Sequence, residues 1–158
     1  HAFQTMMQVA GRAGRRDAGG KVFIQVYDKE NPIVKYVAEG NYVGFMELET
    51  QSRMKFQYPP FVRLIRLSVM HKEKPVAEKA SAMLKTFLKR HFDEKQLLGP
   101  EYPPVARIKN YYIKNILIKL PRNKELGAYK VWISDQITAL LAHSDNRGVR
   151  VITDVDPL

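Results

Sequence analysis

Two arginines close to the N-terminus, Arg12 and Arg15, have the residue type and the spacing for phosphate chemistry. They follow Gln8 in the run QVAGRAGR, at the end of a predicted helix, where residues three apart can project in the same direction. The glycines allow the backbone to approach a ligand closely. Each guanidinium offers planar, bidentate donors, and such a group can neutralise the charge that develops during phosphoryl transfer. Taken alone, the run is equally typical of a flexible basic loop.

A second group of candidate residues is basic and aromatic and follows predicted strands later in the chain. Strict alternation places these side chains on one face of a sheet. They are Arg66, Arg107, Lys109, Tyr111 and Lys119. Such a face would contact the phosphate backbone of DNA with an affinity that falls as salt rises, and the tyrosine could stack on an unpaired base. The alternatives are a solvated or covered face and a tyrosine that packs.

The elements that position these residues follow a regular order after Phe61. Apolar residues alternate in four segments and recur with a helical period in two others. We predict strands over 63–70, 105–112, 115–120 and 149–155, a helix that begins at Pro75, and a helix over 124–142. The order βαββαβ is that of a ferredoxin-like α+β domain, in which an antiparallel sheet carries both helices on one face.

The residues before the two prolines of YPPF predict a different unit. We expect a helix over 2–10, a strand over 21–27 and two helices over about 31–39 and 42–56. The prolines disfavour continuation of a helix. We therefore divide the chain into 1–57, the end of an α/β lobe, and 58–158, a C-terminal binding domain.

The composition excludes several classes of site. The chain has 158 residues, no cysteine and four scattered histidines, which excludes disulfides, cysteine-ligated zinc and iron–sulfur clusters. Asp154 and Asp156 could share a strand face, but without a third ligand we expect them to pair with basic residues. The sequence thus predicts no metal site in this chain.

The charge favours partners that carry phosphate. The formal net charge is +10 and the isoelectric point is about 9.8, and most of the excess positive charge follows Pro60. A solvated basic surface is the alternative explanation. No apolar run is long enough for a membrane span and no signal peptide is evident, so we expect a cytoplasmic protein with no membrane partner.

The run from Gln8 to Arg15 resembles motif VI of superfamily 2 helicases. The segments that follow it are GKVFIQ, YPPF, LGP and, close to the end of the chain, DVDP. Together with motif VI, this succession resembles the C-terminal part of the family of primosomal protein N′, the PriA replication-restart helicases. The resemblance covers essentially the whole chain and agrees with the ferredoxin-like order.

The resemblance implies an ATP-driven 3′-to-5′ DNA helicase of bacteria that acts in replication restart and primosome assembly. ATP and magnesium would be its cofactors, and zinc would be bound outside this chain. Gln8, Arg12 and Arg15 would sense the nucleotide, with the arginines as fingers. Branched or forked DNA, other primosome proteins and the acidic tail of the single-stranded-DNA-binding protein would be partners. The resemblance places the tail near Arg122 and Lys124, for which a surface pair is the alternative.

The departures from the family are as informative as the matches. The chain has no Gly-x-x-x-x-Gly-Lys-[Ser/Thr] phosphate loop, no Asp-Glu-x-His box and no zinc-ligating cysteines, which the family carries upstream of the matched region. We therefore expect a fragment that binds branched DNA and partner proteins but does not hydrolyse ATP alone. The alternative is a free-standing basic module that binds nucleic acid or the ribosome.

Overall fold

The computed structural model describes residues 2–13, 21–123 and 125–157. The chain divides into two compact units, His1–Lys55 and Phe56–Leu158. No helix of the described residues is both long and apolar enough to cross a bilayer.

The first unit contains three helices, α1 (Ala2–Ala13), α2 (Pro32–Ala38) and α3 (Tyr42–Lys55). Helix α2 begins as predicted, because the Asn31 side chain accepts a hydrogen bond from the backbone amide of Ile33 and Pro32 occupies the first turn. Phe3 of α1 is buried and stacks on Phe45 of α3 with ring centroids 4.4 Å apart. Aromatic packing therefore holds α1 against α3.

The strand predicted over residues 21–27 is not formed, so this prediction was wrong. These residues are irregular and exposed, and Phe23 is 91% exposed. A strand needs a neighbouring strand that accepts and donates its backbone hydrogen bonds. In the described parts of the chain, no strand pairs with this segment, so its apolar pattern has no sheet to join.

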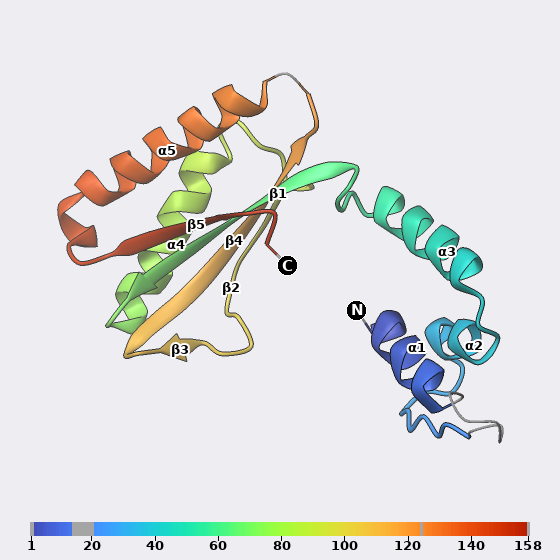
Figure 1. Ribbon diagram of the computed structural model, residues 1–158. Coiled ribbons are helices and arrows are strands. Elements are labelled where there is room, and N and C mark those ends of the chain that lie inside the picture. The colour runs from blue at the N-terminus through green and yellow to red at the C-terminus, as the bar shows by residue number, and fades with distance from the viewer. Residues whose placement is uncertain (1, 14–20, 124, 158) are drawn as a thin grey trace. The chain divides into compact units, whose positions relative to one another are not determined.

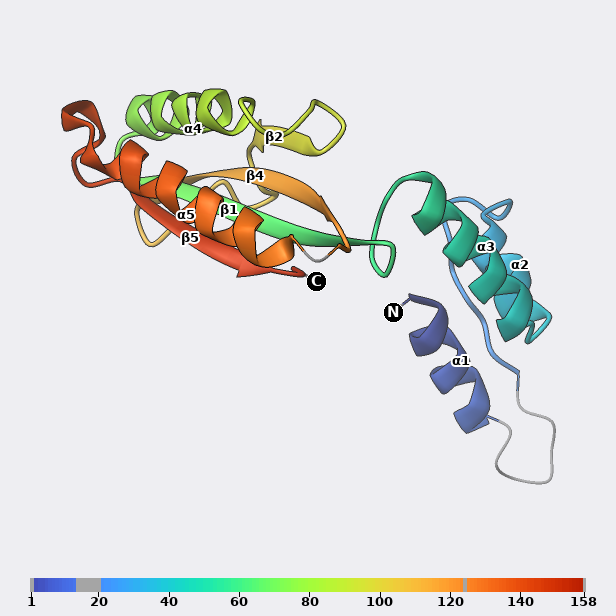
Figure 2. The same cartoon turned by 90° about the horizontal axis from the view of Figure 1, so that it is seen from above.

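The second unit confirms the predicted ferredoxin-like order, with one additional short strand. Its elements are β1 (Val62–His71), α4 (Lys74–Leu88), β2 (Leu97–Glu101), β3 (Arg107–Ile108), β4 (Tyr111–Pro121), α5 (Leu126–Ala142) and β5 (Arg150–Val155) (Figure 1). The sheet order is β2-β4-β1-β5, with β3 paired to β4, and every pair is antiparallel. Helix α4 lies along one side of this sheet (Figure 2).

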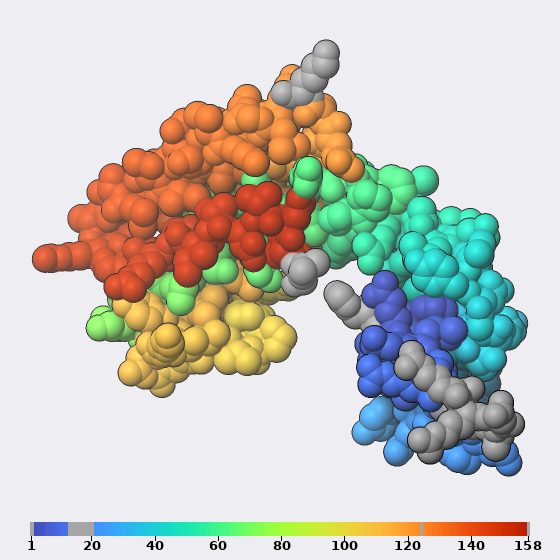
Figure 3. Space-filling model, in the orientation of Figure 1, coloured from blue at the N-terminus to red at the C-terminus, as the bar shows by residue number. Residues whose placement is uncertain are grey.

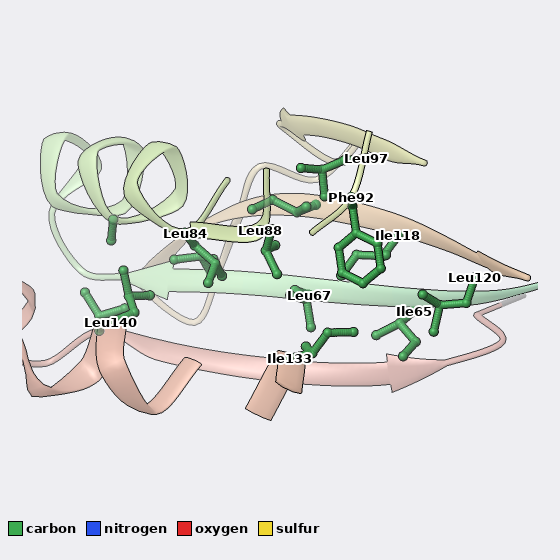
Figure 4. Close-up of a cluster of buried hydrophobic side chains, with 14 residues drawn as sticks. Ile65, Leu67, Leu84, Leu88, Phe92, Leu97, Ile118, Leu120, Ile133 and Leu140 are labelled. Atoms are coloured by element: carbon green, nitrogen blue, oxygen red, sulfur yellow. The ribbon is translucent and has the colours of Figure 1, made fainter. Parts of the chain in front are cut away.

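The core lies between one sheet face and the two helices. Ile65, Leu67 and Val69 alternate along β1 and point into it. Figure 4 shows side chains of both helices turned toward these residues. The main contributors from the other elements are Leu84 and Leu88 of α4, Ile116, Ile118 and Leu120 of β4, and Ile133 and Leu140 of α5. Each such buried side chain contributes about 1.5–3 kcal/mol to stability.

The prediction of one strand over 105–112 was wrong, because this segment contains the short strand β3, a turn and the start of β4. The edge strand β2 lies instead where the sequence predicts a turn. Leu97 is buried and pairs with Ile118 of β4. Gly99 has φ +88°, and a Cβ at this position would lie 2.4 Å from the Asn115 carbonyl oxygen. Glycine and the following Pro100 are typical of an irregular edge strand. Burial of Leu97 thus stabilises a strand in a segment whose glycine and proline favour a turn.

The C-terminal end of the chain is fastened to the start of β1. The Asp156 carboxylate accepts hydrogen bonds from the Leu64 amide at 3.1 Å and from the Arg63 guanidinium. The Leu64 amide, together with Arg63, holds the pKa of Asp156 below its usual range. One pleat away, Asp154 pairs with Arg66 at 2.6 Å. The expectation that both aspartates pair with basic residues is confirmed.

The segment that precedes β1 is fastened to β4 by cations. Lys119 is only 8% exposed, and its ammonium donates to the Phe56 carbonyl at 2.7 Å and lies 4.2 Å from the centroid of the Tyr58 ring. Burial lowers the pKa of this lysine. Arg122 donates to the Pro60 carbonyl at 2.8 Å. Lys119 of β4 and Arg122, directly after β4, therefore hold residues 56–60 in place.

We predict that Asp156→Asn lowers the free energy of unfolding by about 1 kcal/mol at pH 7, because it removes a charged acceptor from two donors. Asparagine tolerates the positive φ of this residue. A carboxylate with a depressed pKa stabilises the fold above its unfolded pKa of about 4, and the contribution is lost as pH falls through the folded value. Urea unfolding at pH 7 and pH 3 measures this.

The difference between the two proteins should therefore shrink in acid. The matched control is Asp145→Asn, whose carboxylate pairs with Lys79 on the surface and should matter less. An Asp156 variant as stable as the parent at pH 7 would contradict this account of the C-terminal end.

We also predict that Lys119→Ala lowers the free energy of unfolding by about 1–2 kcal/mol, because a buried donor and its packed stem are lost. Lys130 is exposed on α5, and Lys130→Ala should change stability by no more than about 0.5 kcal/mol. Thermal or urea unfolding compares the two variants, and equal effects would show that Lys119 does not fasten the preceding segment.

Candidate nucleic-acid interface

A β-hairpin carries three of the residues that the sequence analysis selected. Strand β3 pairs with the start of β4, Arg107 opposite Tyr112 and Ile108 opposite Tyr111. Lys109 and Asn110 form the two-residue turn, with φ of 47° and 67°, as tight hairpin turns require. The segment that contains β3 projects from the lower edge of the second unit in Figure 3, where it is yellow.

The two adjacent tyrosines of β4 lie on opposite faces of the hairpin, because successive side chains of a strand alternate. Each ring is in contact with an arginine guanidinium. The Arg150 guanidinium carbon lies 4.9 Å from the Tyr111 centroid, and that of Arg107 lies 5.1 Å from the Tyr112 centroid. Such cation–π contacts hold a flat guanidinium beside a ring at little entropic cost. Arg107 also donates to the Asn110 side chain at 3.2 Å.

The β1–β4 register shows which face each pair occupies. Tyr112 pairs with His71, two residues from Val69 of the core, and so lies on the helix side of the sheet. Arg107, opposite Tyr112, shares that side, and Lys109 lies in the turn. The prediction that both basic residues share the uncovered face was therefore wrong, because β3 is only two residues long and its register differs from the predicted strand.

A cluster that the sequence analysis missed adjoins Tyr112 on the helix side. The Tyr102 ring has the Lys114 ammonium 4.0 Å and the Lys74 ammonium 5.7 Å from its centroid. Its hydroxyl donates to Glu78 at 2.7 Å, and burial together with this bond raises the pKa of Tyr102 to about 12. The one signal in the sequence is Lys114 itself, which interrupts the apolar alternation of β4 at the end of the core.

These residues define the hairpin-end surface. It contains the cations Lys74, Arg107, Lys109, Lys114 and Arg150 and the rings of Tyr102, Tyr111 and Tyr112. Among the described residues, no carboxylate lies within ion-pairing distance of these five cations. The surface therefore has five cations beside aromatic rings, and the Glu78 carboxylate, bound to the Tyr102 hydroxyl, lies at its helix side. An excess of positive charge beside aromatic rings is a composition that attracts phosphate backbones.

Two other selected residues do not join this surface. Arg66 and Lys119 share the uncovered face with Tyr111, as the alternation predicts. Arg66, however, is bound to Asp154 in the middle of the sheet. Lys119 lies at the far end of β4 and is buried against residues 56–58. The five residues predicted as one DNA site are thus divided among three places.

The remaining selected residues belong to neither group. Gln8 and Arg12 are exposed on α1, four residues apart and therefore on one flank of the helix. Arg122 is exposed and contacts the Pro60 carbonyl. Arg15 and Lys124 lie outside the described residues. No group of three or more potential metal ligands occurs in the described part of the chain.

Comparison with known proteins identifies the family. Residues 54–158 match the family model described as Primosomal protein N C-terminal domain. Replication restart protein PriA of Treponema pallidum is 34% identical over 161 residues, which cover 99% of this chain and 23% of that protein. The PriA proteins of Bacillus subtilis and Chlamydia trachomatis are 33% and 30% identical over 80% and 99% of this chain.

The matches cover most of this chain but only a small part of each relative. The aligned regions cover 16% of the Bacillus subtilis protein and 20% of the Chlamydia trachomatis protein, so the chain spans about a fifth of the length of these relatives. The family model matches most of this chain, from the last two residues of α3 to the C-terminal residue. The chain therefore belongs to the family of the primosomal protein N C-terminal domain.

Proposed function

We propose that the hairpin-end surface binds the phosphate backbone of DNA, as the contribution of this chain to a replication-restart protein. The observation that carries the proposal is the arrangement of Arg107 and Arg150, each held beside a tyrosine and neither ion-paired with a described residue. A guanidinium in contact with a ring can still direct N–H donors at phosphate oxygens.

The distribution of charge supports the same surface over the others. Arg63 and Arg66 are ion-paired with aspartates, and Lys119 is buried, so binding a phosphate there would first require a stabilising contact to break. The hairpin-end cations have no ion pair with a described residue to break, although Arg107 also donates to the Asn110 side chain. Phosphate contact by them would position the chain on DNA without regard to sequence.

The relatives supply the wider role. They are named replication restart proteins, and we propose that this chain serves replication restart within a larger DNA helicase that binds forked DNA and primosome proteins. In that protein, Gln8 and Arg12 on the exposed flank of α1 would face the phosphates of ATP. Guanidinium and amide donors suit that ligand.

The DNA proposal predicts a change in salt dependence. Lys109→Asn removes a charge but tolerates the positive φ of the turn, and Lys114→Gln removes a second charge. The double variant should bind duplex DNA more weakly, and the slope of log affinity against log salt should fall by about 2, because two phosphate contacts are lost. Fluorescence anisotropy at several salt concentrations measures both quantities.

The matched control is the double variant Lys95→Gln and Lys130→Gln, which loses the same charge from two exposed lysines outside the hairpin-end surface. It should keep the parent's slope to within about half a unit, since exposed charges beyond a Debye length of about 10 Å act weakly. Equal effects of the two double variants would refute the hairpin-end surface as the DNA site.

The nucleotide proposal predicts a loss of turnover in the whole protein. Arg12→Ala should lower kcat for DNA-stimulated ATP hydrolysis by about a thousandfold, as removal of an arginine finger does, with a much smaller effect on KM. Lys35→Ala, an exposed cation of α2, is the control and should leave kcat unchanged. An Arg12 variant with the parent's kcat would remove this residue from the ATP site.

A further inference from the structure

The hairpin presents two separate cationic pairs, and each pair faces a different direction. Tyr111 and Arg150 lie on the uncovered face of the sheet, because Arg150 of β5 is the register partner of Met70 of β1, which is on that face. Tyr112 with Arg107 lies on the helix side. The two tyrosines are consecutive, so a single ribbon of two strands separates the guanidiniums.

Each of the two cation–tyrosine pairs has different neighbours on its own face of the sheet. On the helix side, Lys114 and Lys74 continue the positive charge from Arg107 around the Tyr102 ring. On the uncovered face, Arg150 is contributed by the edge strand β5. Only the turn, with Lys109 at its tip, lies where the two directions meet. A backbone that follows one face meets the guanidinium of that face, and a second backbone can meet the other.

We infer that the hairpin holds two DNA backbones at once, one on each face of the ribbon, with Lys109 at the point where they diverge. The inference rests on the proposed function and adds to it a division of labour: Arg107 contacts one arm of a branched molecule and Arg150 contacts the other. The two arginines therefore determine the preference for branched over linear DNA, while general affinity is shared with the lysines.

The division of labour is tested with single variants on two substrates. Arg107→Ala and Arg150→Ala should each lower affinity for a two-armed fork about tenfold, the effect of losing one charge-assisted contact. Each should lower affinity for a linear duplex of the same length no more than about twofold, because the duplex can use the intact face. The double variant should bind both substrates weakly.

The outcomes separate the two proposals. A parent chain that binds neither substrate would overturn both the proposed function and this inference. Binding in which each arginine variant affects fork and linear duplex equally would overturn the inference alone, and this is the result expected of a ribbon inserted into the groove of one duplex. Arg66→Ala is the control and should preserve the ratio of the two affinities.

Cross-linking gives a second readout that does not depend on affinity. The chain has no cysteine, so Arg107→Cys and Arg150→Cys each provide one position for a photoactivatable cross-linker. On a fork whose arms have different lengths, the two labelled proteins should cross-link to different arms. Cross-linking of both to the same arm would overturn the inference, and circular dichroism checks that each labelled protein is folded.

Discussion

The antiparallel register between β1 and β4 is the constraint on which the rest of the second unit depends. Ten consecutive pairs, from Val62 opposite Pro121 to His71 opposite Tyr112, fix which side chains share a face. A shift of β4 by one residue would move Ile116 and Ile118 out of the core and exchange the faces of Tyr111 and Tyr112. Burial of the apolar set therefore also decides where each cationic pair points.

The basic residues of this unit have two kinds of role, and their surroundings separate them. Arg63, Arg66 and Lys119 are bound to carboxylates or backbone carbonyls, and they fasten the C-terminal residues and the segment before β1 to the sheet. The cations of the hairpin end contact tyrosine rings instead. Because a ring does not neutralise a cation, the cations of the hairpin end keep their charge available for a phosphate backbone.

The errors in the sequence analysis have specific physical causes. Residues 21–27 have the pattern of a strand, but a strand forms only with a partner, and pattern alone does not supply one. Gly99 and Pro100 indicate a turn, yet burial of Leu97 beside Ile118 draws them into an edge strand. The face predicted for Arg107 is wrong because its position depends on pairing of the two-residue strand β3 with the start of β4.

The sequence by itself determined the family, the βαββαβ order and the alternation that builds the core, because these follow from local periodicity and from residue types at fixed spacing. Only the tertiary structure decided which cations are available. Lys119, Arg66 and Arg107 are equally basic in the sequence. Their roles differ because folding gives each a different neighbour. Lys119 lies beside Phe56 and Arg66 beside Asp154, which are both distant in sequence, and Arg107 lies beside Tyr112 across a turn.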